Sequence, residues 1–446
     1  MRRLLAGLCA VGLLTGSAGA VVSEMTPPPK EVVEENMPTA DYIASADVLY
    51  ELGLFQGAGV DRFGRPVYEL EGPCTRAEAA VMLVRLLGLE EEAKEAAGTP
   101  FTDLQDWQKP YVNLLYHRGM IRGASYDKFE PESPCTAQMY TALMLRALGY
   151  SDQAGDFTYD NALSFGMRIG LIDNFSCDLD DFRRDDAAQM SRMALELKPK
   201  GSETDLLGKL VQDGAVDAKK AESVHTETAQ ITALTDRVQA SAPYQSEVFA
   251  AILDDGKGNS MSLHGTLINE DSRSRLDGML SIALNGGHSV SQQVIVLRDS
   301  SGISISPWTA GDYRDDQVAA FLRDVNILSL VMTPMPARSL IGDITQKGQT
   351  YTMTLSEGAA QLTFDDKGIP AISSLDMTLH DVMYSVSTET VKTTDVPAFS
   401  LPSGYSSYIK ISNTPLKYLI TVSETENRSD RCPKRYLIHS CFFVKI

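Results

Sequence analysis

Two arginines at expected helix starts are the side chains of this sequence best suited to bind an anion. Arg76 follows Thr75 at the start of an apolar-periodic stretch, and Arg184 stands in the matching place of Arg183-Arg184-Asp185-Asp186. A guanidinium is a planar fork that fits carboxylate geometry, and the first amides of a helix lack intrahelical partners. An anionic sugar substituent therefore suits both positions. The alternative is a pair of solvated surface arginines.

Asp103 and Trp107 are a second pair of candidate binding residues. They precede a stretch with helical spacing through Tyr111 and Leu115. Aromatic faces pack against sugar rings, and carboxylates accept hydrogen bonds from hydroxyl groups. The pair therefore suits the wall of a carbohydrate groove. It suits an N-cap aspartate and a core tryptophan equally well.

The remaining candidates are expected to shape the backbone around these side chains. Thr75 and Glu78 have the spacing of a capping box, so their first role is to stabilise a helix start by about 1 kcal/mol. Asp186 is the acid at the position of the third stretch that matches Glu78. Gly119 and Gly123 are expected to let a ligand or a neighbouring helix come close.

These residues belong to a pattern that occurs three times. Residues 73–88 predict a capped helix with an apolar stripe and a terminal Gly88. Pro-Cys-Thr returns 61 residues later at 134–136, and 183–190 follows 47 residues after Thr136. A leading helix that ends at glycine is expected before each capped helix. These leading helices are expected from Asp41 to Leu52, through Tyr111 and Leu115 to Gly119, and from Phe157 to Gly170.

The repeated landmarks resemble the S-layer homology (SLH) domain. They are Gly-x-x-x-Gly after the first helix, Phe101-x-Asp103 with Trp107 nearby, and Thr75-Arg76-Ala77-Glu78. The resemblance covers residues 39–198 as three copies, about 39–95, 99–152 and 155–198. It implies a mostly helical pseudo-threefold bundle that holds an exported protein to a bacterial secondary cell-wall polysaccharide. That polymer is anionic in many cases, often through pyruvylated sugars, and grooves between copies receive it.

The three copies depart unequally from the SLH pattern. The first lacks a clear Phe-x-Asp before its leading helix, and the second has Ala137 and Met139 in place of arginine and glutamate. The third has Asn174 where the second glycine would stand. One or two fully equipped grooves are therefore expected.

The rest of the chain predicts an α+β multidomain protein, in which an antiparallel β-rich domain with one or two packed helices follows the helical bundle. A linker helix is expected within 199–226, over residues 206–223. The β-rich domain spans 227–410 and starts with a helix from Ile231 to Val238. Another helix is expected from Asp315 to Leu330, and 411–446 form an atypical basic tail. Period-two patterns predict strands at Glu247–Leu253, Met261–Ile268, Met279–Leu284, Val290–Leu297, Tyr351–Leu355, Gln361–Phe364, Leu375–Leu379 and Met383–Val386.

Charge and the N-terminal segment narrow the class of partner. A net charge of -19 and a pI near 4.8 argue against a nucleic-acid partner. Arg2 and Arg3, an apolar run and Ser17-Ala18-Gly19-Ala20 predict a signal peptide over 1–20, followed by a spacer over 21–38. No other segment has transmembrane length.

Cys74 and Cys135 hold the same repeat position, which suits a small buried residue; a disulfide and a metal site are the alternatives.

No catalytic or metal motif accompanies these features. The six histidines are scattered, and the sequence has no His-Glu-x-x-His, Cys-x-x-Cys or Gly-x-Ser-x-Gly pattern. We therefore expect a secreted, S-layer-associated wall-binding protein that is not an enzyme and has no cofactor. The β-rich domain would be its cargo, with an unknown ligand left open. The alternatives are an envelope enzyme such as a wall hydrolase, and a lipid or apolar-ligand carrier.

Overall fold

The computed structural model describes residues 42–411, except for residues 174, 180, 242, 271–272, 286, 300–301, 307–326, 356 and 380. The chain divides into two units, Met1–Glu35 and Asn36–Ile446, and every described residue lies in the second. The expected signal peptide, the spacer and the basic tail from residue 412 lie outside the described residues. Across the part that is described, no helix has the length and apolar character needed to cross a membrane.

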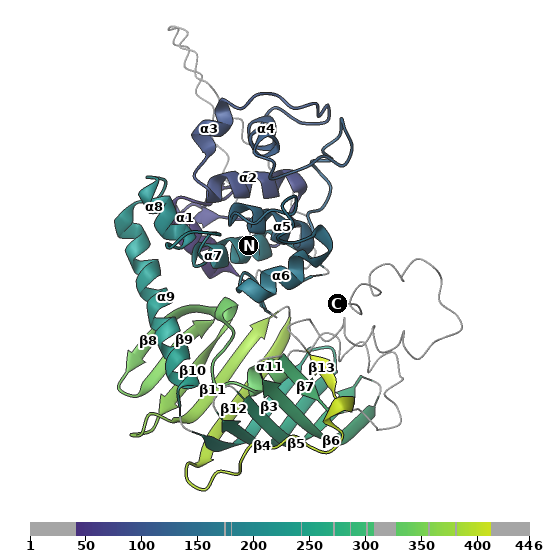
Figure 1. Ribbon diagram of the computed structural model, residues 1–446, viewed down its shortest axis with the longest axis vertical. Coiled ribbons are helices and arrows are strands. Elements are labelled where there is room, and N and C mark those ends of the chain that lie inside the picture. Colours follow the sequence, from purple (N-terminus) through teal and green to yellow (C-terminus); the bar gives the residue numbers. More distant parts are fainter. Residues whose placement is uncertain are drawn as a thin grey trace, which may run out of the picture. The chain divides into compact units, whose positions relative to one another are not determined.

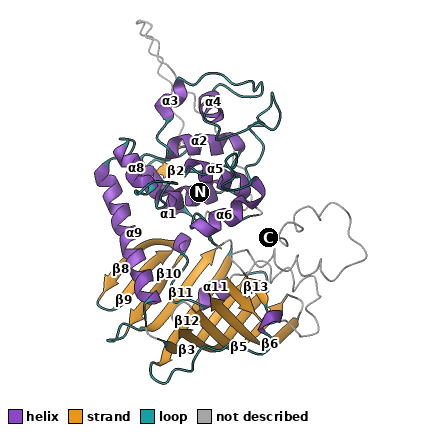
Figure 2. Ribbon diagram, viewed as in Figure 1, coloured by secondary structure: helices purple, strands orange, loops and turns teal. Residues whose placement is uncertain are grey.

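Helices dominate the first half of the described chain, and a large sheet dominates the second (Figures 1 and 2). The fold is therefore mixed α+β. A short hairpin of β1 (Gly59–Val60) and β2 (Pro66–Val67) lies between the first two helices. The helical elements are α1 (Ile43–Leu52), α2 (Arg76–Leu86), α3 (Glu90–Lys94), α4 (Lys109–His117), α5 (Ala137–Ala147), η1 (Tyr159–Asn161), α6 (Ala162–Ile169) and α7 (Arg184–Leu195).

The capped helices begin where their cap residues predict. The Thr75 hydroxyl accepts a hydrogen bond from the Glu78 amide at 3.2 Å, and the Glu78 carboxylate accepts one from the Thr75 amide at 2.8 Å. Both halves of the predicted capping box are thus confirmed. In the third stretch the Asp186 carboxylate accepts a hydrogen bond from the Arg183 amide at 2.7 Å.

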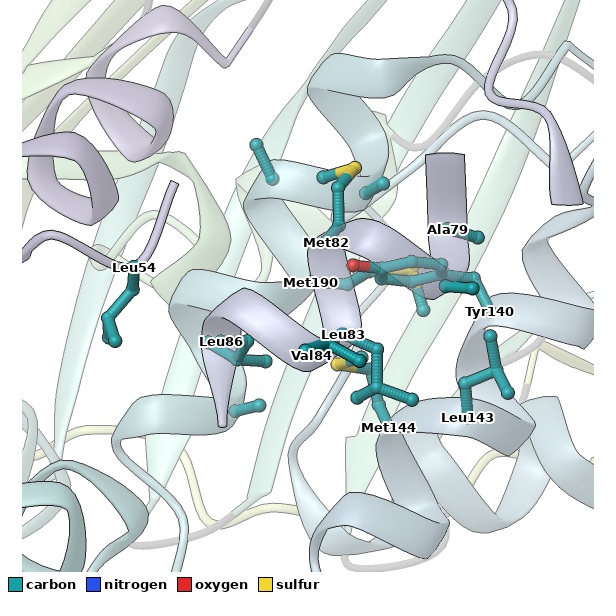
Figure 3. Packing of buried hydrophobic residues seen from close by; sticks show 14 of the residues in the cluster. Leu54, Ala79, Met82, Leu83, Val84, Leu86, Tyr140, Leu143, Met144 and Met190 are labelled. Carbon is teal, nitrogen blue, oxygen red and sulfur yellow. The ribbon is translucent and has the colours of Figure 1, made fainter. Parts of the chain in front are cut away.

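The three capped helices α2, α5 and α7 contribute to one hydrophobic core. Figure 3 shows Leu83, Met144 and Met190, one from each of these helices, in the same packed cluster. All three side chains are fully buried. The apolar stripes that the sequence predicts for the repeated helices therefore meet in a shared interior.

The expected linker helix is wrong in its bounds. Two helices replace it, α8 (Leu206–Gln212) and α9 (Ala218–Gln239), so the boundary expected at residue 226 falls inside α9. Gly214 separates them with a φ of 76°, a left-handed conformation that ends the first helix. Asp217 then starts the second helix, because its carboxylate accepts hydrogen bonds from the amides of Lys219 and Lys220. The expected helix from Ile231 to Val238 is the end of α9.

Among the described residues, eleven antiparallel strands form the sheet, in the order β13-β7-β6-β5-β4-β3-β12-β11-β10-β9-β8. All eight predicted strands are present. The sequence missed β7, β8 and β13. Of the helix expected over 315–330, residues 327–330 lie within the described part of the chain, and they belong to α11 (Ile327–Val331). The strands are β3 (Tyr244–Asp254), β4 (Ser260–Glu270), β5 (Arg273–Leu284), β6 (His288–Asp299), β7 (Gly302–Ile305), β8 (Ile341–Lys347), β9 (Thr350–Leu355), β10 (Gly358–Phe364), β11 (Pro370–Leu379), β12 (Val382–Lys392) and β13 (Ile409–Ile411).

One face of this sheet is buried. Along β5, Leu276, Leu280 and Ile282 are buried, whereas Met279 on the opposite face is exposed. This alternation is the expected result of a period-two sequence in a sheet with one covered face. The end of α9 contacts the sheet, where the Arg237 guanidinium lies 3.8 Å from the centre of the Phe364 ring.

Candidate functional site

The starts of α2 and α7 are each bonded to the loop of another copy. The Arg76 amide donates to the Ser133 carbonyl at 3.0 Å, and the Arg184 amide donates to the Gly72 carbonyl at 3.1 Å. Gly72 and Ser133 are 61 residues apart, which is the repeat spacing. We call these contacts the first junction (residues 73–77 with 129–135) and the second junction (residues 69–73 with 183–185).

These bonds correct one sequence-based expectation. The next amides are also paired, because Ala77 donates to the Pro131 carbonyl and Asp185 donates to the Leu70 carbonyl. The expectation that Arg76 and Arg184 stand beside free helix amides is therefore wrong. Because carbonyl oxygens of neighbouring loops accept hydrogen bonds from those amides, the guanidinium groups are the donors left to bind an anion.

Arg76 is half-buried at the first junction. Its Nε donates to the Phe129 carbonyl at 2.9 Å and its Nη2 donates to the Arg122 carbonyl at 3.2 Å. The guanidinium carbon lies 4.7 Å from the centre of the Phe129 ring. Its Nη1 faces the Met139 sulfur at 4.0 Å. The guanidinium is thus held in place by neutral groups, and in the described part of the chain no carboxylate forms an ion pair with it.

Arg184 occupies the matching place at the second junction but has an acidic partner. Its Nη1 donates to the Glu69 carbonyl at 2.7 Å, and its Nη2 lies 2.8 Å from a Glu78 oxygen. The side chain is 18% exposed. A Cβ on Gly72 would lie 2.8 Å from Arg184 Nη1, so glycine there makes room for the guanidinium. Glu78 consequently serves both its own helix cap and the arginine of another copy.

Asp103 and Arg76 both form hydrogen bonds with the loop 122–130. Its carboxylate accepts hydrogen bonds from the amides of Phe129 and Glu130 at 3.0 and 2.9 Å. Desolvation raises the pKa of Asp103, but these two amide hydrogen bonds, together with the Asp103 amide and the charge of Lys128, leave the pKa lowered. The N-cap alternative for Asp103 is wrong, because Gln108 holds the N-cap position of α4.

Trp107 is half-buried and does not belong to the core. Its indole nitrogen donates to the Gln105 side-chain oxygen at 2.9 Å, and the side chain is absent from the hydrophobic cluster among the described residues. The core alternative is therefore wrong, and part of the indole surface remains open to a ligand.

Gly119 and Gly123 have geometric roles. Gly119 adopts a φ of 70°, which favours glycine at a helix end. A Cβ on Gly123 would lie 2.4 Å from the Phe101 ring and 2.5 Å from the Ser125 carbonyl oxygen. The close approach expected at Gly123 exists, but the group that approaches is an aromatic ring and a loop carbonyl.

Asp186 is a buried cap carboxylate. It is 2% exposed and accepts hydrogen bonds from the amides of Asp178 and Arg183. Burial, followed by the charge of neighbouring Asp185, raises its pKa well above the usual range. Its geometry serves the start of α7.

The structure therefore gathers the candidate residues into two groups. Arg76 and Asp103 both bind the loop 122–130, which contains Gly123, and Arg184 pairs with Glu78, the capping partner of Thr75. The sequence missed Gly72, Glu69 and Phe129. The repeat spacing carried a signal for Glu69, because Glu130 stands 61 residues after it. Both residues adopt a positive φ, 51° and 58°.

Where α5 meets the third copy, an uncharged side chain makes the contact that Arg76 and Arg184 make at the two junctions. Ala137 replaces the arginine, and the neighbouring Gln138 donates to the Tyr159 carbonyl at 2.7 Å. The departure of the second copy from the SLH pattern therefore removes a cation here.

A cavity of about 460 Å³ lies elsewhere, between α9 and residues 333–341. It combines apolar Ile231 and Met335 with charged Glu196 and Arg338, and Arg338 Nε donates to Glu196 at 3.0 Å. This charged lining does not favour the apolar-ligand carrier. Among the described residues, no group of three or more His, Cys, Asp or Glu side chains could hold a metal ion.

Comparison with known proteins identifies surface proteins as relatives. The cell surface protein of Thermoanaerobacter kivui is 30% identical over 189 residues, which are 41% of this chain and 23% of that protein. The surface layer protein of Brevibacillus choshinensis is 31% identical over 126 residues, 28% of this chain and 11% of that protein. S-layer protein EA1 of Bacillus anthracis is 26% identical over 271 residues, 58% of this chain and 30% of that protein.

No protein-family model matches the chain. The chain spans less than a third of the length of each of these three relatives. Their names nevertheless agree with the expected signal peptide and with the surface role expected from the repeats. The chain is a secreted protein of the cell surface, related to S-layer and cell-wall proteins.

Proposed function

We propose that residues 39–198 are an SLH triplet that binds an anionic secondary cell-wall polysaccharide and so attaches the protein to the cell wall. Three lines support this: the threefold sequence pattern, the two junctions with matching hydrogen bonds, and relatives named as cell surface, surface layer and S-layer proteins. The β-rich domain, expected over residues 227–410 and built on the sheet from β3 to β13, is the proposed cargo.

The observation that carries the proposal is that no carboxylate among the described residues compensates the charge of Arg76. Its guanidinium is fixed by two carbonyl oxygens and by the Phe129 ring, and it has no ion pair among the described residues. A fixed cation without an acidic partner attracts a carboxylate at little entropic cost. We therefore assign the main anion-binding role to the first junction.

The other candidates take supporting roles. Arg184 is a weaker second site, because an incoming anion must compete with Glu78. Trp107 offers its half-open indole face to a sugar ring. Asp103, Gly119, Gly123, Thr75, Glu78 and Asp186 position the loops and helix starts.

The test is co-sedimentation of the full chain with purified cell-wall sacculi. Arg76→Ala should weaken binding roughly 10- to 100-fold, the loss expected for one charge-assisted contact, and Arg184→Ala should weaken it less. Arg118→Ala is the charge-matched control, because Arg118 is exposed and pairs with Glu92. Chemical removal of the secondary polymer should release the wild-type protein. Undiminished binding to stripped sacculi would refute the proposal.

A further inference from the structure

Cys74 and Cys135 lie opposite each other at the first junction. Thr75 and Pro134 form an antiparallel bridge, which places the two cysteines directly across from one another. The Cys135 amide donates to the Cys74 carbonyl at 2.7 Å. Opposed residues of an antiparallel pair have Cα atoms about 4.5–5.5 Å apart, inside the range of about 4.4–6.8 Å that disulfides require.

The two thiol groups also face one another. A hydrogen bond with the Cys135 thiol, followed by burial, raises the pKa of the Cys74 thiol well above its usual range. Cys74 is 0% exposed and Cys135 is 3% exposed. Each sulfur otherwise contacts only weakly, at 3.7 Å, the carbonyl of the residue that follows it. The pair therefore occupies a buried site in which the two thiol groups interact with each other.

The third copy shows why the site is a pair and not a metal centre. Pro73 and Arg183 form the matching bridge at the second junction, so that Phe182 takes the place of a third cysteine. Phe182 is 7% exposed and its ring lies 5.6 Å from that of Tyr140. Two opposed sulfurs with an aromatic neighbour suit a covalent bridge better than the tetrahedral ligand set of a metal.

We propose that Cys74 and Cys135 form a disulfide that joins the first two copies covalently once the protein is outside the cell. A secreted chain meets an oxidising environment, in which opposed cysteines form bridges. The oxidant is a disulfide RSSR, carried by an oxidoreductase or a small molecule. One cysteine thiolate attacks it, forms a mixed disulfide and releases one RS⁻. The second thiolate attacks the mixed disulfide and releases the other, and the two cysteine protons leave with these thiolates as two RSH.

Burial determines when this exchange takes place. Both sulfurs are inaccessible in the folded core, so the reaction precedes closure of the junction during folding. The bridge then closes a loop of 61 residues, and it should raise the melting temperature by roughly 10 °C.

The experiment refolds the full chain from urea with oxidised and reduced glutathione, then denatures and alkylates it for non-reducing tryptic mass spectrometry. We expect a linked pair of peptides covering residues 63–76 and 129–146, and a lower melting temperature after reduction. Oxidised glutathione added to folded, reduced protein should produce little of this pair. Cys177→Ser is the control, and it should keep both the link and the shift.

Two results would overturn the inference. One is recovery of both cysteines in alkylated form after oxidative refolding. The other is linkage of Cys74 or Cys135 to a different cysteine. The double variant Cys74→Ser/Cys135→Ser should show no shift on reduction. If it does not fold, the peptide map of the wild type still decides.

Discussion

Arg184 of the third copy forms an ion pair with Glu78 of the first, with 2.8 Å between Nη2 and Oε1. At the first junction the place of this glutamate is taken by Met139, whose sulfur lies 4.0 Å from Arg76 Nη1. Two arginines in matching positions therefore differ in their charge environment: the Arg184 charge is compensated by a carboxylate, and the Arg76 charge faces a thioether.

This difference can be reversed with one substitution. Met139→Glu should place a carboxylate beside Arg76, compete with the polysaccharide anion and weaken wall binding about tenfold. Met139→Gln is the matched control, because glutamine has the size and polarity of glutamate without its charge. Co-sedimentation with sacculi measures both variants. Equal binding by Met139→Glu and wild type would show that Arg76 does not bind the anion.

The ion pair at the second junction should also stabilise the fold. Because the Arg184 and Glu78 side chains are 18% and 29% exposed, solvent screening reduces the coupling to about 0.5–1 kcal/mol. A double-mutant cycle with Arg184→Ala and Glu78→Ala, followed by urea unfolding, measures this coupling directly. Strictly additive effects would mean that the two groups act independently.

Gly123 should tolerate no side chain. Gly123→Ala would push a methyl group into the Phe101 ring and the Ser125 carbonyl, so we expect a loss of about 1–3 kcal/mol in the free energy of unfolding. Gly98→Ala is the control, since a Cβ there would meet nothing within 4 Å. A Gly123→Ala protein as stable as Gly98→Ala would show that the loop moves away easily.

Asp186 should make stability depend on pH. Desolvation and the Asp185 charge raise its pKa, so the folded state keeps a proton that the unfolded state releases above about pH 4. This contribution is complete below the unfolded-state pKa and is lost as the pH rises through the raised pKa. Wild type should therefore lose stability relative to Asp186→Asn as the pH rises above about 4.

Urea unfolding at several pH values measures this difference. The control is Asp160→Asn, which removes an exposed aspartate of the same copy and should follow the wild-type pH dependence. Parallel pH profiles for wild type and Asp186→Asn would contradict the assignment.

Local patterns predicted much of the fold. The Thr75 capping box and the eight strands follow from neighbouring residues alone, and all are present. β8 escaped prediction because its burial pattern is mostly exposed, so it lacks apolar alternation. The division between α8 and α9 did carry signals, Gly214 and the N-cap Asp217, which the apolar spacing obscured.

The contacts of the candidate site could not be predicted in the same way. Arg76 binds a carbonyl 53 residues away, and Arg184 binds one 115 residues away. Such partners depend on how the copies pack, and no local periodicity encodes them. The sequence therefore identified the arginines but gave their helix amides the wrong role.

The place at which the chain enters the sheet has a mechanical consequence. β3, which follows α9, pairs with β4 on one side and β12 on the other. A pull transmitted from a wall-bound anchor along α9 would therefore load an interior strand. Extracting such a strand breaks two hydrogen-bonded ladders at once, whereas an edge strand can be peeled away along one. A protein tethered at its helical end would thus carry tension into a strand that is held on both sides.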